Sequence, residues 1–279
     1  MNAAGFKAVL VAAGVGSRLR PLTDALPKCL MPINGRPLLG IWLDILARGG
    51  VTEVVVNLHH HADLVRDYLR RSPYSRLVTP VFEQELLGTG GTLLRNRDRL
   101  NTGPFLFAHA DNLSSFDSGR LLAAHRGRPA GTAMTMMTFD TEEPQQCGII
   151  ERDARGVVVG FHEKSPNPPG RLANAAVFVL EPEVLDFLGS LGRSFAEFST
   201  DVIPHFIGRI ATYHNDVYHR DIGSPASLLR AQIEYPLAVG RHSADPASDP
   251  WFGLMTEADG RLARALTDAV SEALRTSTK

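Results

Sequence analysis

Between Lys7 and His109, short apolar runs alternate with segments whose apolar residues recur at helical spacing. The runs have the length of buried strands, and the segments between them have the length of crossover helices. Parallel strands need such crossovers, so the alternation predicts an α/β fold with a mainly parallel, doubly wound, Rossmann-like sheet. The expected strands are residues 7–13, 53–58, 77–82 and 105–109, and the expected helices are residues 37–48, 62–71 and 89–100.

From about Gly131 the pattern changes to strand-rich segments. This change predicts a smaller α+β half that packs on the first half. We therefore expect one domain over residues 1–236, with one half at about 1–130 and the other at about 131–236. The expected elements of the second half are strands 132–139, 148–151, 157–161 and 175–180, and helices 183–188, 200–206 and 225–235.

The C-terminal region, residues 237–279, has a different character. Residues 241–250 have the composition of a linker. Beyond them apolar residues repeat at i, i+4 spacing, which predicts an amphipathic helix. That helix either docks on its own chain or joins two chains as a homo-oligomer. The repeating residues are Leu262, Leu266, Val270 and Leu274.

The balance of charge excludes several classes of partner. Lysine and arginine total 29 against 30 acidic residues, so the chain has no global basic field for nucleic acid or an anionic membrane. Cys29 and Cys147 are far apart and lack metal-ligand spacing, which fits a reducing cytosol. No apolar stretch reaches about 18 residues. We therefore expect a cytoplasmic protein that binds neither nucleic acid nor membrane.

A glycine-containing loop follows the first expected strand. Gly14 and Gly16 would let the backbone approach phosphates, while Arg18 and Lys28 add fixed positive charge. Two glycines alone are equally typical of a tight turn. A dinucleotide-binding fingerprint needs a third glycine where Leu19 stands, and a P-loop needs Gly-Lys-Ser/Thr, which is missing. The loop therefore indicates a triphosphate site of another kind.

The motif around this loop extends well beyond the glycines. The run from Gly14 to Thr23, followed by Pro27-Lys28, resembles the signature G-x-G-[ST]-R-L-x-P-L-T…P-K of the sugar-1-phosphate nucleotidylyltransferases. The resemblance spans about residues 7–235 and is closest in pattern to mannose-1-phosphate and heptose-1-phosphate guanylyltransferases. It implies the nucleotide-diphospho-sugar transferase fold, a triphosphate contact from Arg18 and charge neutralisation by Lys28. The nucleotide-binding residues that it implies in this loop are Ala12, Ala13, Gly14, Gly16, Ser17, Arg18 and Lys28.

Two aspartates are candidate ligands for Mg²⁺. Asp111 stands just past the apolar run 105–109, at the carboxyl end of an expected strand, where ligands bind in open α/β sheets. The resemblance implies a metal-binding aspartate there and a second one, Asp221, in a segment similar to W-x-D-I-G. Two carboxylates can hold Mg²⁺ while water and phosphate oxygens fill its other positions. The alternatives are a turn role for Asp111 and a helix cap for Asp221, and His219 replaces the aromatic residue common there.

Three short segments resemble the sugar pocket of the family. Gly148 lies in Cys-Gly-Ile, which resembles Y-G-[VI] and implies room for the sugar ring. Glu163 and Lys164 resemble the pair in V-x-E-K-P, which implies that Glu163 meets sugar hydroxyls and Lys164 meets the sugar phosphate. Asn174 lies in a segment that resembles N-A-G and implies a bond to the sugar. An exposed ion pair between Glu163 and Lys164 is the alternative. The departures from the family pattern are Cys147, Ser165 and Ala176.

Glu83 is a candidate reader of the nucleotide base. The segment from Glu83 to Thr92 resembles E-x-E-P-L-G-T-[AG]-G, in which Gly88 would let the base lie against the backbone and Thr89 would cap the following helix. A carboxylate accepts two hydrogen bonds, and guanine presents two adjacent donors, whereas uracil and thymine present one donor between acceptors. The sequence therefore favours GTP. A Glu83 turned to solvent and a UTP or dTTP donor stay open as alternatives.

Together these residues predict a Mg²⁺-dependent transfer of a nucleoside monophosphate from a triphosphate to a mannose- or heptose-type sugar 1-phosphate, with release of pyrophosphate. No general base is needed, because a sugar 1-phosphate is already an oxyanion near neutral pH. The alternatives are a uridylyl- or thymidylyltransferase of another sugar 1-phosphate, and a catalytically silent regulatory subunit that binds nucleotide sugars. The resemblance implies catalytic roles for Arg18, Lys28, Asp111, Lys164 and Asp221.

Overall fold

Four parallel strands form one side of a mixed nine-stranded sheet in the computed structural model, which describes residues 6–240, 264 and 268. Alternate residues of the first strand enter different apolar clusters, because Ala8 and Leu10 pack on one face and Val9 packs on the other. Both faces are therefore buried, as expected for parallel strands with continuous apolar runs. In order across the sheet, the four strands are β6 (Phe105–His109), β1 (Phe6–Val11), β4 (Val51–Leu58) and β5 (Val78–Phe82).

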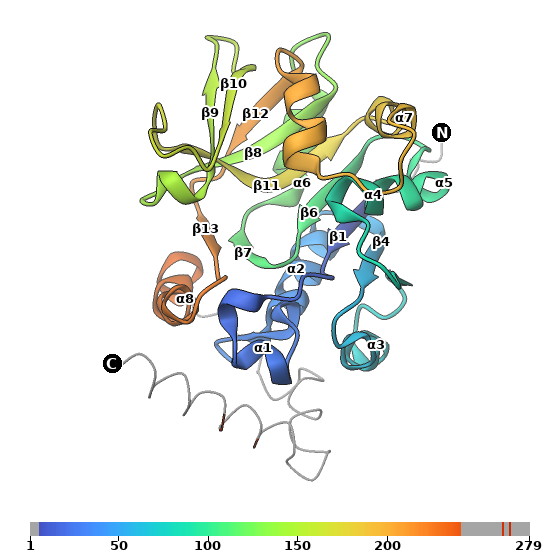
Figure 1. Ribbon diagram of the computed structural model, residues 1–279, viewed down its shortest axis with the longest axis vertical. Helices are drawn as coiled ribbons and strands as arrows, with labels where there is room; N and C mark the ends of the chain where they lie inside the picture. Colours follow the sequence, from blue (N-terminus) through green and yellow to red (C-terminus); the bar gives the residue numbers. More distant parts are fainter. Residues whose placement is uncertain (1–5, 241–263, 265–267, 269–279) are drawn as a thin grey trace.

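Helices cover both faces of this parallel part (Figure 1). Because each face of the sheet is apolar, a helix layer on each side is needed to keep water from both. The doubly wound α/β fold predicted from the sequence is thus confirmed. The layer on the side of Ala8 contains α2 (Leu38–Arg48), α3 (Ala62–Arg71) and α6 (Ser118–Arg126), and the layer on the side of Val9 contains α4 (Gly88–Arg95), α5 (Arg97–Leu100) and α7 (Glu183–Ser190).

The sheet continues into the second half of the chain through β11 (Leu172–Leu180). This strand pairs antiparallel with β6 along one edge and with β8 (Met134–Asp140) along the other. Because the sheet is continuous, residues of the two halves are held in a fixed relation to each other. The remaining strands of the sheet are β9 (Gly148–Arg152), β10 (Val158–Glu163) and β12 (Ile210–His214).

Short ribbons and helices lie outside the main sheet. One two-stranded ribbon pairs β7 with β13 in antiparallel register, and α8 follows β13 in the chain. Arg220 of β13 holds α8 in place through an ion pair with Glu234, with Nη2 2.9 Å from Oε1. The bounds of these elements are β7 (Asn112–Ser115), β13 (Tyr218–Asp221), α8 (Pro225–Val239), β2 (Pro32–Ile33), β3 (Arg36–Pro37) and α1 (Leu22–Ala25).

Two predicted helices are wrong in form. The helix expected over residues 89–100 is divided at Asn96, whose side-chain nitrogen donates to the carbonyl of Thr92 at 2.9 Å. Such local side-chain bonds compete with the helical ladder. The helix expected over residues 200–206 is instead a π-helical turn at Phe198–Val202 followed by a 3₁₀ turn at Pro204–Phe206. Proline has no N–H to donate, so an α-helix cannot continue regularly through residue 204.

The predicted linker and C-terminal amphipathic helix lie outside the described residues, apart from two positions. Arg264 and Asp268 are helical and exposed. The continuous part of the described chain ends at Gly240, directly after α8. Among the residues that the structure describes, no helix has both the length and the apolar character that crossing a bilayer requires.

A bulge interrupts the pairing of β11 with β8 between Asn174 and Phe178. Within it, Asn174 Oδ1 accepts a hydrogen bond of 2.9 Å from the N–H of Ala176, and Ala176 adopts a left-handed φ of 53°. A residue with a Cβ atom is disfavoured in this conformation by about 1–2 kcal/mol. The backbone therefore explains why glycine suits this place in the N-A-G pattern.

We expect Ala176→Gly to raise the free energy of unfolding by about 0.5–1 kcal/mol, because relief of the left-handed strain exceeds the entropy that glycine adds to the unfolded chain. Urea unfolding measures the difference. Ala175→Gly is the matched control, because Ala175 is buried and has no positive φ, and it should lower the stability. Equal losses in the two variants would contradict the strain at Ala176.

Candidate active site

Two aspartates and a lysine meet at one point although they are far apart in the sequence. Lys28 Nζ lies 3.1 Å from Asp111 Oδ2 and 2.9 Å from Asp221 Oδ1. Arg18 reaches the same cluster, with Nη2 3.0 Å from Asp221 Oδ2. Four of the five predicted catalytic residues are thus brought together in one charged cluster.

The ribbon of β7 and β13 produces this juxtaposition. β7 begins directly after Asp111, and β13 ends on Asp221, which is paired with Asn112. Asp111 therefore directly precedes the residue that pairs with Asp221, which brings the two carboxylates close together. The N–H of Ala110 donates to the carbonyl of Val11 at 2.9 Å, so Asp111 lies at the sheet edge where the glycine loop leaves β1. This is the carboxyl edge, at which open α/β sheets bind ligands.

Burial and ion pairing shift the pKa values of Lys28 and Asp221 in opposite directions. Burial alone would lower the pKa of Lys28, but the carboxylates of Asp111 and Asp221 outweigh it and hold that pKa above its ordinary value. Burial alone would raise the pKa of Asp221, but Lys28 and then Arg18 hold it below its ordinary value. At neutral pH the ammonium and the Asp221 carboxylate are therefore both charged.

The two glycines of the loop have different roles. A Cβ added to Gly14 would meet nothing within 4 Å, so this exposed position leaves open space for a ligand. Gly16 has φ +64°, and an added Cβ would lie 2.8 Å from Thr23 Cγ2, so the turn itself requires this glycine. Ser17 and Arg18, which follow, are exposed. The loop therefore presents Gly14, Ser17 and Arg18 to solvent from a fixed turn.

The first strand ends at Val11 rather than at the predicted residue 13, because the next backbone N–H has a side-chain acceptor. The N–H of Ala12 donates to Asn57 Oδ1 at 2.7 Å, and both Ala12 and Ala13 are buried. Asn57 Nδ2 in turn donates to Thr92 Oγ1 at 3.2 Å. The sequence reasoning did not identify Asn57, because a polar residue near the end of a strand carries no motif of its own.

This chain of hydrogen bonds leads to the predicted base reader. Thr92 Oγ1 donates to Glu83 Oε1 at 2.7 Å, while Glu83 Oε2 is buried and has no hydrogen-bond partner. Glu83 is only 1% exposed, so the alternative of a side chain turned to solvent is wrong. A buried acceptor without a donor is costly, by about 1–3 kcal/mol. Glu83 Oε2 is therefore a position at which a ligand donor would be stabilising.

The segment after Glu83 is held by a loop of the second half. Gly88 has φ +74°, and an added Cβ would lie 2.5 Å from the carbonyl oxygen of Ala196, so the backbone of the protein itself packs closely there. The predicted helix cap by Thr89 is wrong, because Thr89 lies inside α4, which begins at Gly88. Its hydroxyl donates instead to Glu197 Oε2 at 3.0 Å and accepts from the N–H of Phe198 at 2.8 Å. Glu197 was also missed by the sequence reasoning.

Three of the four predicted sugar-binding residues lie where β9 and β10 pair. Glu163 faces Gly148 in the antiparallel register, and a Cβ added to Gly148 would lie 2.7 Å from Glu163 Oε2. The glycine thus makes room for the glutamate side chain and for the ring of Phe161, whose Cε2 and Cζ would also lie 2.7 Å from that Cβ. Lys164 Nζ lies 3.8 Å from Glu163 Oε1, and the Lys164 side chain is 69% exposed. Asn174, the fourth predicted residue, uses Oδ1 within the β11 bulge.

Two residues that depart from the family pattern, Cys147 and His219, stand close in sequence to predicted site residues, Gly148 and Asp221. Burial raises the pKa of the Cys147 thiol, and the charges of Asp221 and Glu163 add to the effect. The carbonyl of Cys147 accepts a hydrogen bond of 3.0 Å from the N–H of Lys164, so Cys147 lies beside the predicted sugar segment. His219 replaces an aromatic ring and still packs as one, with its centroid 4.2 Å from that of Phe139. Burial lowers the pKa of His219 to about 4, so the ring is neutral at pH 7.

The charged cluster fits Mg²⁺ by the chemistry of its donors. Asp111 and Asp221 each direct a carboxylate oxygen at one cation, the Lys28 ammonium, and their side chains are 37% and 47% exposed. Magnesium is usually held by one or two carboxylates together with water and phosphate oxygens. No group of three or more His, Cys, Asp or Glu residues suited to a metal occurs in the described part of the chain. The two aspartates therefore suit a shared metal that needs a phosphate ligand, rather than a metal in an all-protein cage.

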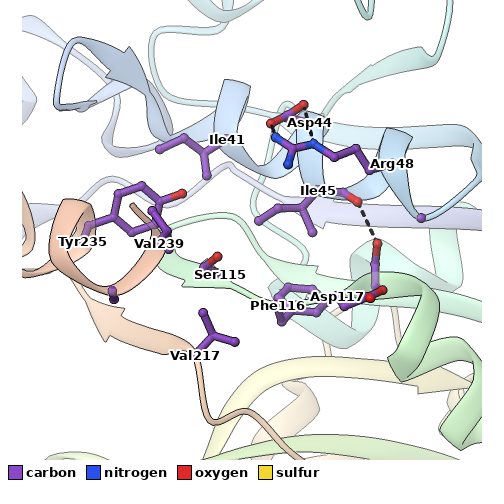
Figure 2. Close-up of a pocket in the computed structure, with 13 residues that line it drawn as sticks. Ile41, Asp44, Ile45, Arg48, Ser115, Phe116, Asp117, Val217, Tyr235 and Val239 are labelled. Carbon is purple, nitrogen blue, oxygen red and sulfur yellow. Dashed lines mark hydrogen bonds and ion pairs between the residues drawn. The ribbon is translucent and has the colours of Figure 1, made fainter. Parts of the chain in front are cut away.

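A cavity of about 470 Å³ lies elsewhere, between α2, α8 and the far end of the β7–β13 ribbon. Figure 2 shows Ile41, Ile45, Val217 and Tyr235 around it, together with the Asp44–Arg48 ion pair. Neither Lys28 nor the carboxylates that bind it line this cavity. The candidate active site is therefore defined by convergent charge and not by this cavity.

Known proteins resemble this chain over most of its length. The sequence model of the nucleotidyl transferase family matches residues 7–236. The chain is 27% identical over 258 residues to a mannose-1-phosphate guanyltransferase of Schizosaccharomyces pombe, and this alignment covers 88% of this chain and 70% of the relative. It is 32% identical over 186 residues to the probable mannose-1-phosphate guanylyltransferase 3 of Oryza sativa subsp. japonica, which covers 64% of this chain and 51% of the relative. The matched region thus spans between about half and 70% of these relatives.

Solved structures share the fold. A putative glucose-1-phosphate thymidylyltransferase from Bacillus anthracis superposes with a TM-score of 0.77 at 18% identity, over 86% of this chain and 98% of that chain. HddC from Yersinia pseudotuberculosis complexed with GMP-PN superposes with a TM-score of 0.70 at 21% identity, over 82% of this chain and 99% of that chain. At these identities the likeness establishes the fold alone. The family match includes the glycine loop, Lys28 and both aspartates, and the chain therefore belongs to the nucleotidyl transferase family.

Proposed function

We propose that this protein transfers GMP from GTP to a mannose-type sugar 1-phosphate, giving a GDP-sugar and pyrophosphate, with Mg²⁺ as cofactor. The observation that carries the proposal is the convergence of Asp111 and Asp221 on Lys28, beside the open glycine loop. Joining a triphosphate to a sugar phosphate brings two polyanions together. The main task of such a site is therefore to offset their repulsion and to align them.

The residues of the cluster divide this task. An oxygen of the sugar 1-phosphate attacks the α-phosphorus in line, and pyrophosphate leaves, so no covalent intermediate and no general base are needed. In this proposal Lys28, which is fixed by both aspartates, neutralises charge at the α-phosphate, and Arg18, whose side chain is paired with Asp221 but 66% exposed, contacts the triphosphate. Mg²⁺ held by Asp111 and Asp221 would supply further charge neutralisation.

Two observations support guanine as the base and mannose as the sugar type. Glu83 Oε2 is a buried acceptor without a donor, and guanine supplies adjacent N–H donors. Oε2 is enclosed, so the side chains around it must move apart for a base to reach it. Curated relatives are named mannose-1-phosphate guanyltransferases, and a structure with the same fold was determined with GMP-PN.

A grid of nucleoside triphosphates against sugar 1-phosphates tests the proposal directly. GTP with mannose 1-phosphate should release pyrophosphate faster than UTP, dTTP or CTP, and faster than glucose or heptose 1-phosphate. A best reaction with UTP or dTTP would replace the guanylyl assignment and leave nucleotidyl transfer standing. Nucleotide binding by calorimetry with no turnover in any combination would identify a silent regulatory protein instead.

We expect Asp111→Asn to lower kcat by at least about a hundredfold and to raise the Mg²⁺ concentration needed for half-maximal rate, because a charged oxygen ligand is lost. Circular dichroism should show an unchanged fold. Asp63→Asn is the control, because the Asp63 side chain is 97% exposed on α3. Wild-type turnover by Asp111→Asn at saturating Mg²⁺ would remove Asp111 from the site.

Glu83→Gln should narrow the preference for GTP over UTP by roughly ten- to a hundredfold, because an acceptor facing guanine becomes a donor, a mismatch of about 1–3 kcal/mol. The amide oxygen can keep the bond from Thr92, so the fold should hold. The measurement is kcat/KM for both nucleotides with one sugar 1-phosphate. Glu85→Gln, two residues along and exposed, is the matched control. An unchanged ratio in Glu83→Gln would show that Glu83 does not read the base.

Lys164→Ala should lower kcat/KM for the sugar 1-phosphate by roughly ten- to a hundredfold and leave the nucleotide Kd nearly unchanged, because one charge-assisted contact is worth about 1.5–3 kcal/mol. Arg155→Ala, in the turn between β9 and β10, removes an exposed cation on the same hairpin as a control. Equal losses in sugar-phosphate efficiency and nucleotide affinity would move Lys164 to the triphosphate side.

A further inference from the structure

The three most exposed large apolar side chains of the described structure lie on one helix. Leu229, Ile233 and Leu237 of α8 are 61%, 67% and 81% exposed. Residues four apart lie on one face of a helix, so they form a continuous apolar stripe, here called the α8 stripe. Among the described residues this is the largest departure from the expectation that apolar side chains are covered.

The α8 stripe belongs to a firmly attached helix. The other side of α8 buries Ala231 and Tyr235 against the body of the protein. Gln232 adds hydrogen bonds to the β2–β3 ribbon, through the carbonyl of Pro32 at 2.6 Å and the N–H of Asn34 at 2.8 Å. Figure 1 shows α8 at the edge of the molecule, away from the main sheet. The stripe is therefore a rigid outer surface and not the side of a loose helix.

The size of the stripe favours a tethered occupant. Three aliphatic side chains offer roughly 200–400 Å² of apolar surface, whereas a stable interface between separate proteins covers about 800 Å² on each partner. A segment of the same chain needs much less surface, because its tether gives it an effective concentration of about millimolar. The area thus argues for a piece of this chain rather than a second copy.

The chain itself supplies a segment with the matching pattern. Thirty-nine residues follow Gly240 in the 279-residue sequence, and within them four apolar residues recur at spacing four. Arg264 and Asp268 are helical and exposed, and on a helix they lie on the side opposite these apolar residues. Residues 241–261 number 21, and a flexible tether of that length spans roughly 25 Å, about twice the ~12 Å length of the stripe, which is long enough for the following segment to turn back. The apolar residues are Leu262, Leu266, Val270 and Leu274.

We propose that residues 262–274 form an amphipathic helix whose apolar side docks on the α8 stripe of the same chain. The contact covers Leu229, Ile233 and Leu237 and gives the C-terminal region a defined place. It is an interaction surface outside the charged cluster, so it stands whether or not the proposed reaction is correct. Because α8 begins four residues after Asp221, the contact also braces the segment that carries this carboxylate.

Cross-linking of the full-length chain tests the contact and the identity of the occupant. Ile233→Cys together with Leu266→Cys is treated with a short bis-maleimide whose reach matches the ~8–10 Å between packed helix axes. The control pair is Val159→Cys with Leu266→Cys, because Val159 is also apolar and 53% exposed but lies on β10. Peptide mapping identifies the linked cysteines and separates them from the native Cys29 and Cys147.

The proposal expects a 233–266 cross-link in a product of monomer mass at micromolar protein, at least tenfold more abundant than the control link. The same link in a product of dimer mass would overturn it in favour of exchange between two copies. Absence of the 233–266 link, or equal yield from the control pair, would overturn docking on α8 altogether.

A thermal double-mutant cycle gives a second readout that needs no cross-linker. Ile233→Asp and Leu266→Asp should each lower Tm by about 2–6 °C, because each places a carboxylate in the apolar contact. The double variant should lose no more than the larger single loss, since both disrupt one contact. Fully additive losses, or an unchanged or raised Tm in either single variant, would overturn the contact.

Discussion

The buried ammonium of Lys28 is the group on which the site depends. The Lys28 side chain is 5% exposed, and an isolated charge at such a position would be strongly destabilising. Asp111 and Asp221 compensate it, which requires the end of β6, the end of β13 and the turn after the glycine loop to meet within hydrogen-bond distance. In the proposed reaction the same three segments would also hold the metal and the two phosphates. Stability of the charge and placement of the proposed catalytic groups are therefore one structural requirement.

A second set of hydrogen bonds connects the glycine loop to the segment that begins at Glu83. It runs from the N–H of Ala12 through Asn57 and Thr92 to Glu83. His59 adds a parallel connection, with Nδ1 2.9 Å from the carbonyl oxygen of Glu83. These bonds are buried or partly buried, so they are stronger than their exposed counterparts would be. These bonds thus fix the distance between the glycine loop and Glu83, the proposed phosphate and base sites.

The second half of the chain contacts both the segment after Glu83 and the charged cluster, through one loop and one strand. The loop that ends in Ala196 and Glu197 clamps α4, with the Ala196 carbonyl accepting from the N–H groups of Gly90 and Gly91 at 2.8 and 3.1 Å. The β7–β13 ribbon links the two halves a second time and carries one carboxylate from each. Because the main sheet is continuous through β11, these links do not have to hold two separate bodies together. Their role is to set the positions of particular side chains.

The sequence alone determined the fold class and most of the charged cluster. Apolar periodicity predicted the parallel strands and their helices, because a strand buried on both faces needs a continuous apolar run and a helix that covers it needs apolar residues at helical spacing. The extended motif around Gly14 pointed to Arg18 and Lys28, and short motifs pointed to Asp111 and Asp221. The tertiary structure decided the roles of residues that act through contacts between segments distant in the sequence. Asn57 and Glu197 have no motif, and they matter because distant segments bring an acceptor to a particular N–H or hydroxyl. The roles of Gly16, Gly88 and Gly148 likewise follow from close contacts with Thr23, Ala196 and Glu163, and such contacts exist only after the chain has folded.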